Sequence, residues 1–170
     1  MKAALKAKAL DILDSCHDLA IATSRPDGFP QATTVSFVHD GLTLYIGVGI
    51  TSQKASNLRK DPRASVTMTP PYKDWDDITG LSMAVHAEEV TLAEDIKMIG
   101  KLMLKRFPQI ADMATPAEMN TATFYRLTPQ IISVLDYAKG FGHADTVSVD
   151  NYDIAESLES MQHKWLIPVP

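Results

Sequence analysis

The stretch "ATTVSFVHDGLTLYIGVG", residues 32–49, decides the fold. Two runs of alternating residues flank Asp40-Gly41, and an Asp-Gly pair between such runs is a strong signal for a β-hairpin. Successive side chains of a strand point to opposite faces, so each run has one mostly apolar face. These faces carry Thr33, Val35 and Phe37 in the first run, and Leu42, Leu44, Ile46 and Val48 in the second. The stretch therefore predicts two antiparallel strands that share an apolar side.

Strand patterns continue on both sides of this hairpin. Before it, "DLAIATSR" is short and apolar, and "RPDGFPQ" has the proline and Asp-Gly of a turn, so residues 19–49 are predicted to form a three-stranded meander. After it, strand character returns in residues 63–69, 80–92 and 122–137, the last as one or two strands broken near Pro129. An antiparallel sheet of about six strands removes its edges by closing. We therefore predict a mainly β fold with flanking helices, built on a six-stranded antiparallel barrel.

Helices are predicted beside the strands. Residues 3–16 and 93–107 carry apolar side chains at helical spacing, and residues 153–163 do so weakly. A helix of about two turns begins after Thr51 or Ser52, either of which can cap it, and ends at Asp61-Pro62, because proline disfavours helical geometry in the residue before it. We expect one domain over residues 1–170, with an N-terminal helix at 3–16, the barrel at 19–137 and a C-terminal tail at 138–170.

The composition bounds the class of protein. With 45% hydrophobic and 22% charged residues the chain is typical of globular proteins, while a net charge of -5 and a pI near 5.4 argue against a nucleic-acid-binding surface. No apolar run is long enough to span a bilayer, and the N-terminus lacks the apolar segment of a signal peptide. We therefore expect a cytoplasmic protein without nucleic-acid or membrane partners. The single cysteine, Cys16, excludes an internal disulfide and is interpreted as a small core residue rather than a nucleophile.

The segment "TSQKASNLRKDPRASVTM", residues 51–68, concentrates positive charge in an acidic chain. Its basic residues are Lys54, Arg59, Lys60 and Arg63. A helix N-terminus has unpaired N–H groups and partial positive charge, and therefore favours anions. Thr51 and Ser52 add hydroxyls there, and the glycines Gly47 and Gly49 let a ligand approach the backbone. Two interpretations remain open, a phosphate cradle that uses Lys54 or a capped helix with a solvated face.

Residues 22–68 resemble the pyridoxamine 5'-phosphate oxidase-like family of flavin-binding split β-barrels. The family pattern joins a D-G-x-P turn, a D-G-x-x-L-Y hairpin, an S-x-K-x-x-N-L segment and an x-P-R-x-S-V segment. The corresponding positions are residues 27–30, 40–45, 52–58 and 62–66. The resemblance implies a split barrel and a homodimer with each flavin at the subunit interface.

The resemblance also implies a set of binding residues for FMN. The phosphate would be held by Ser52 and Lys54, with Thr51 and Asn57 as neighbours. The ribityl chain would be lined by Ile46 and Gly47. The isoalloxazine ring would lie along the second strand, at Thr33, Thr34, Val35 and Ser36.

The second strand departs from that of true pyridoxamine phosphate oxidases, which carry an arginine and a lysine there. This chain has "QATTVSF" instead, so we do not expect vitamin B6 oxidation. We expect an FMN-dependent oxidoreductase acting on a small molecule, with NAD(P)H as a candidate electron donor. Hydride transfer to flavin needs no protein acid or base, and no catalytic residue is assigned. Deazaflavin F420 is an alternative cofactor, and a flavin-binding protein without turnover is an alternative function.

The segment "KGFGHAD", residues 139–145, has two interpretations. It is either a turn that leaves the barrel or a loop that faces a cofactor. Its Gly-Phe-Gly resembles haem-utilisation relatives of the same barrel, in which a C-terminal histidine ligates haem, and this makes His143 the candidate ligand for haem as the alternative cofactor. No pair of histidines has metal-ligand spacing, so no other metal site is predicted. The acidic pair Glu88-Glu89 is interpreted as solvated charge.

Overall fold

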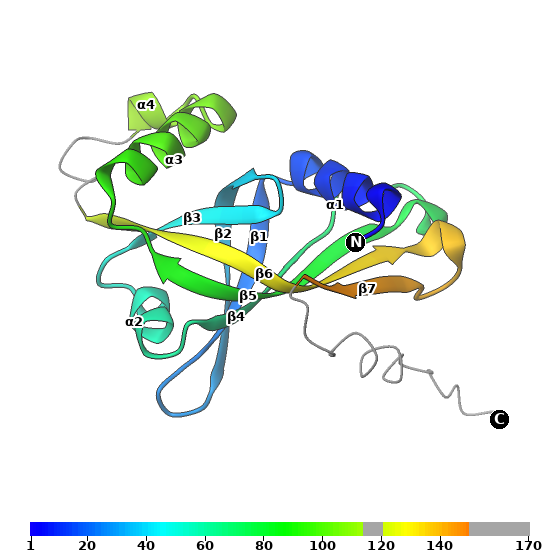
Figure 1. The fold of residues 1–170 in the computed structure, drawn as a ribbon, viewed down its shortest axis with the longest axis horizontal. Helices are drawn as coiled ribbons and strands as arrows, with labels where there is room; N and C mark the ends of the chain where they lie inside the picture. The colour runs from blue at the N-terminus through cyan, green and yellow to red at the C-terminus, as the bar shows by residue number, and fades with distance from the viewer. Residues whose placement is uncertain (114–120, 150–170) are drawn as a thin grey trace.

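The computed structural model describes residues 1–113 and 121–149 (Figure 1). The elements follow the order α1 (Ala3–Ser15), β1 (Asp18–Ser24), β2 (Pro30–Asp40), β3 (Thr43–Gly49), α2 (Gln53–Lys60), β4 (Arg63–Met68), the 3-10 turn η1 (Trp75–Asp77), β5 (Thr79–Glu89), α3 (Ala93–Arg106), α4 (Ile110–Met113), β6 (Ala122–Asp136), the 3-10 turn η2 (Tyr137–Lys139) and β7 (Ala144–Ser148).

The strands form one antiparallel sheet that closes on itself. Their order is β3-β2-β1-β4-β5-β6-β7, and β3 also pairs with β6. The pairing of β3 with β6 completes a six-stranded barrel, while β7 extends the sheet beyond it along the far half of β6. The predicted mainly β, six-stranded antiparallel barrel is confirmed. Closure leaves β3 without a free edge, which is the expected advantage of a barrel.

Side chains fill the barrel interior. The inward faces of β2 and β3 are those that the alternating pattern predicts, and β2 pairs with β3 from Phe37↔Ile46 to Asp40↔Thr43. The largest fully buried side chains of this core are Tyr125, Phe37, Leu13, Leu19, Ile21, Leu44, Ile46, Leu81, Met83, Leu127 and Ile132. The interior is therefore a packed core, and a ligand has to use the outer surface or the ends of the barrel.

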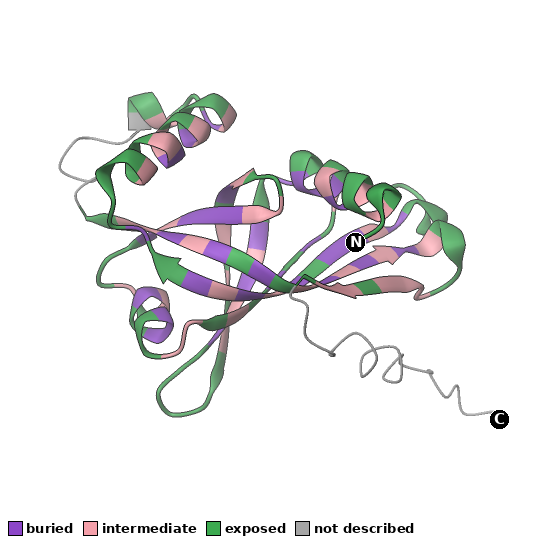
Figure 2. Ribbon diagram, viewed as in Figure 1, coloured by how far each residue is buried: buried purple, intermediate pink, exposed green. Residues whose placement is uncertain are grey.

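A second apolar cluster lies outside the barrel wall. Helix α3 covers the outer faces of β2 and β3, where Val38 and Tyr45 pack against Ile99, Met103 and Phe107. For this reason both faces of β3 contain buried residues (Figure 2). The sequence predicted the inward face of β3 but not the burial of Tyr45, because its cover comes from a helix about fifty residues further along the chain.

Helix α1 lies against the opposite end of the barrel. Its residues Ala9, Ile12 and Leu13 are buried in the main core. Cys16, the C-cap residue, is 6% exposed, and burial raises the pKa of its thiol. A buried thiol with a raised pKa is a poor nucleophile, so the interpretation of Cys16 as a small core residue is confirmed.

The C-terminal half of the sheet differs from the sequence analysis in two respects. β6 is one continuous strand and is not broken near Pro129, because its pairing with β5 shifts register between Ala84 and Val85, opposite Ile131 and Pro129. Such a bulge lets a strand accommodate a residue that cannot donate a ladder hydrogen bond. β7 was not predicted, since residues from 138 onward were assigned to a tail. The weak helix expected at 153–163 lies outside the described residues.

Candidate functional site

The start of helix α2 carries polar groups that the fold leaves available. Ser52 is the N-cap, its Oγ accepting from Ala55 N at 3.2 Å, and Ser52 N donates to Gly49 O at 3.0 Å. In the described part of the chain, the backbone N–H groups of Gln53 and Lys54 have no acceptor. Such N–H groups point away from the helix and carry the positive end of its dipole. The Ser52 hydroxyl hydrogen remains free to donate in the same region.

Lys54 lies in the first turn of α2 and is half-buried. Within residues 1–113 and 121–149, no acceptor lies within hydrogen-bond or ion-pair distance of its Nζ. Burial lowers the pKa of the Lys54 ammonium, because partial desolvation disfavours the charged form. An anion placed beside it would offset this cost. The residues expected to hold a phosphate therefore lie together at one helix end.

The other basic residues of the segment are arranged differently. Arg59 pairs with Glu89, with Nε 3.1 Å from Oε2, and Arg63 pairs with Asp61, with Nη2 2.7 Å from Oδ2. Lys60 is exposed at the other end of α2. Of the four basic residues in the segment, Arg59 and Arg63 therefore form ion pairs, Lys60 is solvated, and Lys54 lies at the start of the helix.

Asn57 is buried, and its side chain makes three hydrogen bonds. Its Nδ2 donates to Thr23 Oγ1 and to Gln31 Oε1, both at 3.0 Å, and its Oδ1 accepts from Gln53 Nε2 at 2.8 Å. These hydrogen bonds tie α2 to β1 and β2. Asn57 is expected as a neighbour of the phosphate, and that contact stays a prediction. In the structure its side chain holds the helix in place and hydrogen-bonds Gln53, the first residue of α2.

The four residues expected along the ring divide between the two faces of β2. Thr34 and Ser36 are exposed on the outer face, whereas Thr33 and Val35 are half-buried on the inner face. The Ser36 Oγ donates to Asp18 Oδ1 at 2.6 Å. Thr34 and Ser36 therefore offer side chains to an external ligand, while the other two positions offer only backbone.

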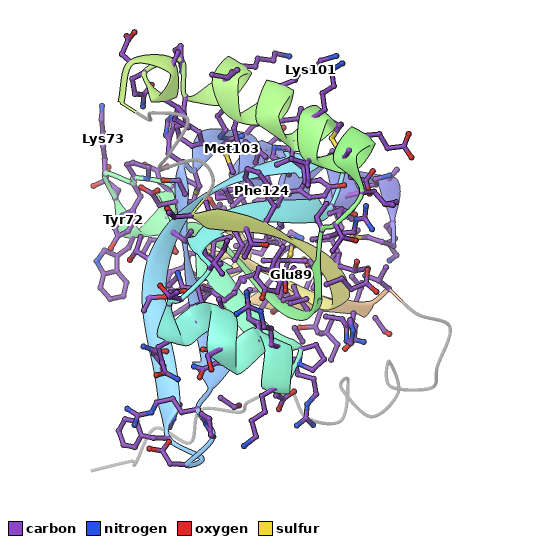
Figure 3. All side chains as sticks on the ribbon, turned by 90° about the vertical axis from the view of Figure 1, so that its left-hand side faces the viewer. Tyr72, Lys73, Glu89, Lys101, Met103 and Phe124 are labelled. Carbon is purple, nitrogen blue, oxygen red and sulfur yellow. The ribbon has the colours of Figure 1, made fainter. Side chains whose placement is uncertain are left out.

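Ile46 and Gly47 are less accessible than the sequence suggested. Ile46 has no exposed surface and belongs to the barrel core, so its side chain does not reach an external ligand. A Cβ at Gly47 would lie 3.2 Å from the ring of Phe124, the residue paired with it on β6. Phe124 packs with Met103 on the α3 side of the wall, and Glu89 lies on the α2 side (Figure 3). The glycine thus makes room for Phe124.

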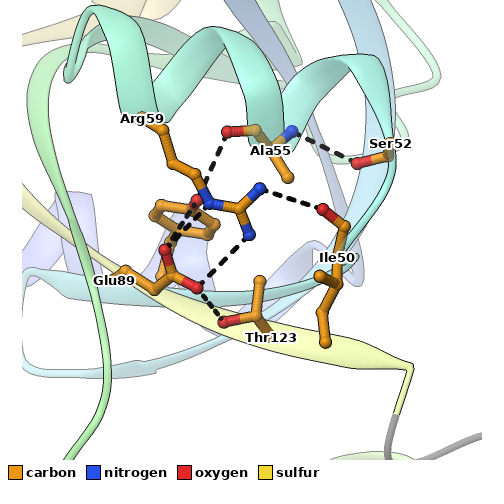
Figure 4. A network of polar contacts seen from close by, with 7 residues as sticks. Ile50, Ser52, Ala55, Arg59, Glu89 and Thr123 are labelled. Atoms are coloured by element: carbon orange, nitrogen blue, oxygen red, sulfur yellow. Dashed lines mark hydrogen bonds and ion pairs between the residues drawn. The ribbon is translucent and has the colours of Figure 1, made fainter.

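A polar network beneath α2 was missed by the sequence analysis (Figure 4). Glu89 Oε1 accepts from Thr123 Oγ1 at 2.8 Å, and the Tyr125 hydroxyl lies 3.4 Å from Glu89 Oε2 and from Ala55 O. Arg59 and then Thr123 lower the pKa of the Glu89 carboxyl. Glu89 is therefore a paired carboxylate, and its interpretation as solvated charge is wrong. The sequence does not indicate this pairing, because the partners of Glu89 lie on α2 and β6, far away in the sequence.

His143 lies in the turn between β6 and β7. Gly140 and Gly142, on either side of Phe141, have φ values of 136° and 70°, which favour glycine. The turn returns the chain to the sheet. The His143 Nε2 lies 3.3 Å from Asp145 Oδ2. Next to it, the exposed rings of Trp75 and Phe141 stack with centroids 5.8 Å apart and an interplanar angle of 8°.

Residues 1–113 and 121–149 contain no helix that is both long and apolar enough to cross a membrane. They also contain no group of three or more His, Cys, Asp or Glu side chains arranged to hold a metal ion.

Comparisons with known proteins agree on one fold. The sequence profile described as pyridoxamine 5'-phosphate oxidase matches residues 5–136. No curated protein sequence matches the chain. Among solved structures, a haem-binding protein from Mycobacterium smegmatis has a TM-score of 0.72 and 20% identity, covering 87% of this chain; the chain spans 59% of that protein's length. A conserved hypothetical protein from Mycobacterium tuberculosis has a TM-score of 0.70 and 26% identity, covering 88% of this chain and 92% of its own. The haem storage protein HutZ from Vibrio cholerae has a TM-score of 0.62 and 20% identity, and the match covers 74% of this chain and 89% of HutZ.

Proposed function

The chain belongs to the pyridoxamine 5'-phosphate oxidase family, and from this premise we propose that it is an FMN-dependent oxidoreductase. The observation that carries the proposal is the half-buried Lys54 ammonium without an acceptor among the described residues, beside free N–H groups at the start of α2. These groups fit a phosphate monoester, which needs a cation and several donors. When bound, FMN would supply the hydride chemistry.

The residues of the chain would bind and orient the cofactor. Lys54, the Ser52 hydroxyl and the N–H groups of α2 would hold the phosphate, and Thr51 is exposed at the same turn. The outward hydroxyls of Thr34 and Ser36 would face the ring. A lysine at a helix end, without an acceptor among the described residues, suits the terminal phosphate of FMN. β2 contains no arginine or lysine, which argues against a phosphorylated vitamer as substrate, and the substrate is proposed to be another small molecule.

The outer face of the sheet supports a homodimer. Strand registers align two rows of side chains across it, and nearly all of them are alanine, serine or threonine. The rows are Thr34, Ala20, Thr67, Ser82, Ser133 and Thr146, and Ala32, Ala22, Ser65, Ala84, Ile131 and Ser148. No charged residue stands in these two rows, which is unusual for a sheet face that stays in water and suits close packing of a second copy. Because the interior is packed, a second subunit would supply the missing wall of the flavin site.

The test of the proposal is the variant Lys54→Ala. We expect its FMN affinity to fall at least about tenfold, because a charge-assisted contact to phosphate contributes about 1.5–3 kcal/mol. Quenching of flavin fluorescence on titration measures the affinity. Lys60→Ala, which removes the same charge from the exposed end of the same helix, is the matched control and should bind FMN like the wild type. Equal affinity of Lys54→Ala and wild type would refute the phosphate site.

Two alternative functions can be tested on the same protein preparation, by NAD(P)H oxidation and by an absorption spectrum. A flavin-binding protein without turnover would bind FMN but show no NAD(P)H oxidation above that of free FMN. Haem is favoured by one observation, the exposed flat surface of Trp75 and Phe141 beside His143, together with the haem-binding protein among the structural relatives. An absorption spectrum with a Soret band and no flavin uptake would assign the cofactor to haem and the ligand to His143.

A further inference from the structure

The turn that precedes α2 is held by few contacts. Ile50 is 40% exposed, so burial does little to fix it. Its N–H donates to Thr121 O at 2.9 Å, and its carbonyl oxygen accepts from Arg59 Nη1 at 3.0 Å. Arg59 lies two turns further along α2 and reaches back to the residue just before Thr51 and Ser52. The side chain thus ties the start of the turn to the body of the helix.

Arg59 is itself oriented by Glu89. Arg59 Nε lies 3.1 Å from Oε2 and its Nη2 lies 3.4 Å from Oε1, so two arms of the guanidinium meet the carboxylate while the third reaches Ile50 (Figure 4). Thr123 holds the carboxylate from β6. The pair therefore fixes the turn against two strands of the barrel. It also neutralises Arg59, which leaves Lys54 as the unpaired cation at the start of α2 in the part of the chain that the structure describes.

We propose that Arg59 and Glu89 are positioning residues for the phosphate site, setting the turn at residues 50–52 so that the hydroxyls and N–H groups at the start of α2 converge on one anion. This inference rests on the proposed function, because it assumes that FMN phosphate binds there. The effect should appear in recognition of the phosphate rather than of the ring. The ratio of riboflavin to FMN dissociation constants isolates that contribution, since the two ligands differ only in the phosphate.

The experiment measures this ratio by fluorescence quenching in full-length variants. For Arg59→Met we expect the ratio to fall about tenfold, as for loss of a contact to a charged group, with riboflavin affinity changed less than about twofold. Arg63→Met removes the same charge from the same segment, where Arg63 pairs with Asp61 on the surface, and should keep the wild-type ratio. Equal losses for FMN and riboflavin would indicate a general structural role and overturn the proposal.

A double variant separates positioning from simple electrostatics. In Arg59→Met the Glu89 carboxylate loses its partner and could repel phosphate, whereas Arg59→Met/Glu89→Gln removes both charges and still lacks the contact to Ile50. We expect the double variant to keep the low ratio. Recovery of the wild-type ratio would overturn positioning and leave only charge repulsion. If Arg59→Met does not fold, Arg59→Lys keeps the charge but cannot reach Ile50 and Glu89 together, and should lower the ratio in the same way.

Lys54→Ala distinguishes failure of this inference from failure of the proposed function. A lower ratio in Lys54→Ala with an unchanged ratio in Arg59→Met would keep the phosphate site and refute the role of Arg59. An unchanged ratio in Lys54→Ala would refute the phosphate site, and the proposal on Arg59 and Glu89 with it.

Discussion

Asn57 has no exposed surface, and its side-chain amide joins α2 to two strands of the barrel. A buried amide that makes three hydrogen bonds leaves several polar partners unsatisfied when it is removed, and Thr23, which is 5% exposed, has little access to water. At the scale of single residues, the position of the α2 N-terminus therefore depends on a buried side chain one turn further along the helix.

We expect Asn57→Ala to lower the free energy of unfolding by about 2–3 kcal/mol, because the buried Thr23 hydroxyl loses its partner and a cavity remains. Urea denaturation monitored by circular dichroism measures the change. Ser56→Ala, at the exposed neighbouring position of α2, should stay within about 0.5 kcal/mol of wild type. A loss as small as this control in Asn57→Ala would mean that α2 is held by its apolar contacts alone.

At the scale of elements, the sequence correctly predicted those turns and helix ends that neighbouring residues determine. The Asp-Gly pair and the alternating apolar residues predict the hairpin around Asp40-Gly41. The proline predicts the end of α2 at Asp61-Pro62. β7 could not be predicted, because its residues are only half-buried and its turn runs through η2 and two glycines rather than a short hairpin loop. The pairing of Arg59 with Glu89 joins residues thirty apart, and no sequence spacing indicates it.

The junction of α2 and β4 should make stability depend on acid. Arg63 lowers the pKa of Asp61 from 3.8 to about 2 through its side chain and backbone N–H. A carboxyl whose pKa is lowered by folding stabilises the native state above its unfolded value, and this contribution disappears as the pH falls through the folded value. We expect wild type to be more stable than Asp61→Asn at pH 5, with the difference shrinking between pH 4 and pH 2. Urea unfolding across this range measures it, and a difference that does not change with pH would contradict the assignment.

At the scale of the whole molecule, the packed interior and the rows of small side chains on the outer face point to the same arrangement. The core fills the barrel, so a ligand would lie outside it, and Thr34 belongs to the rows of small side chains that run across β2, β1, β4 and β5. A site on an open sheet face would expose a flavin ring to water on one side. A second copy placed on this face would enclose the ring, so cofactor binding and dimerisation should be coupled.

Thr67→Arg tests this coupling. Thr67 is exposed on β4 between Ala20 and Ser82, near the middle of the outer face, where a large charged side chain would be buried without a partner in a dimer. We expect wild type to sediment as a dimer and Thr67→Arg as a monomer, with FMN affinity reduced at least about tenfold. Gln109→Arg adds the same charge on the exposed segment after α3 and should remain a dimer with wild-type affinity. A dimeric Thr67→Arg, or a monomer that binds FMN as tightly as wild type, would place the cofactor away from this face.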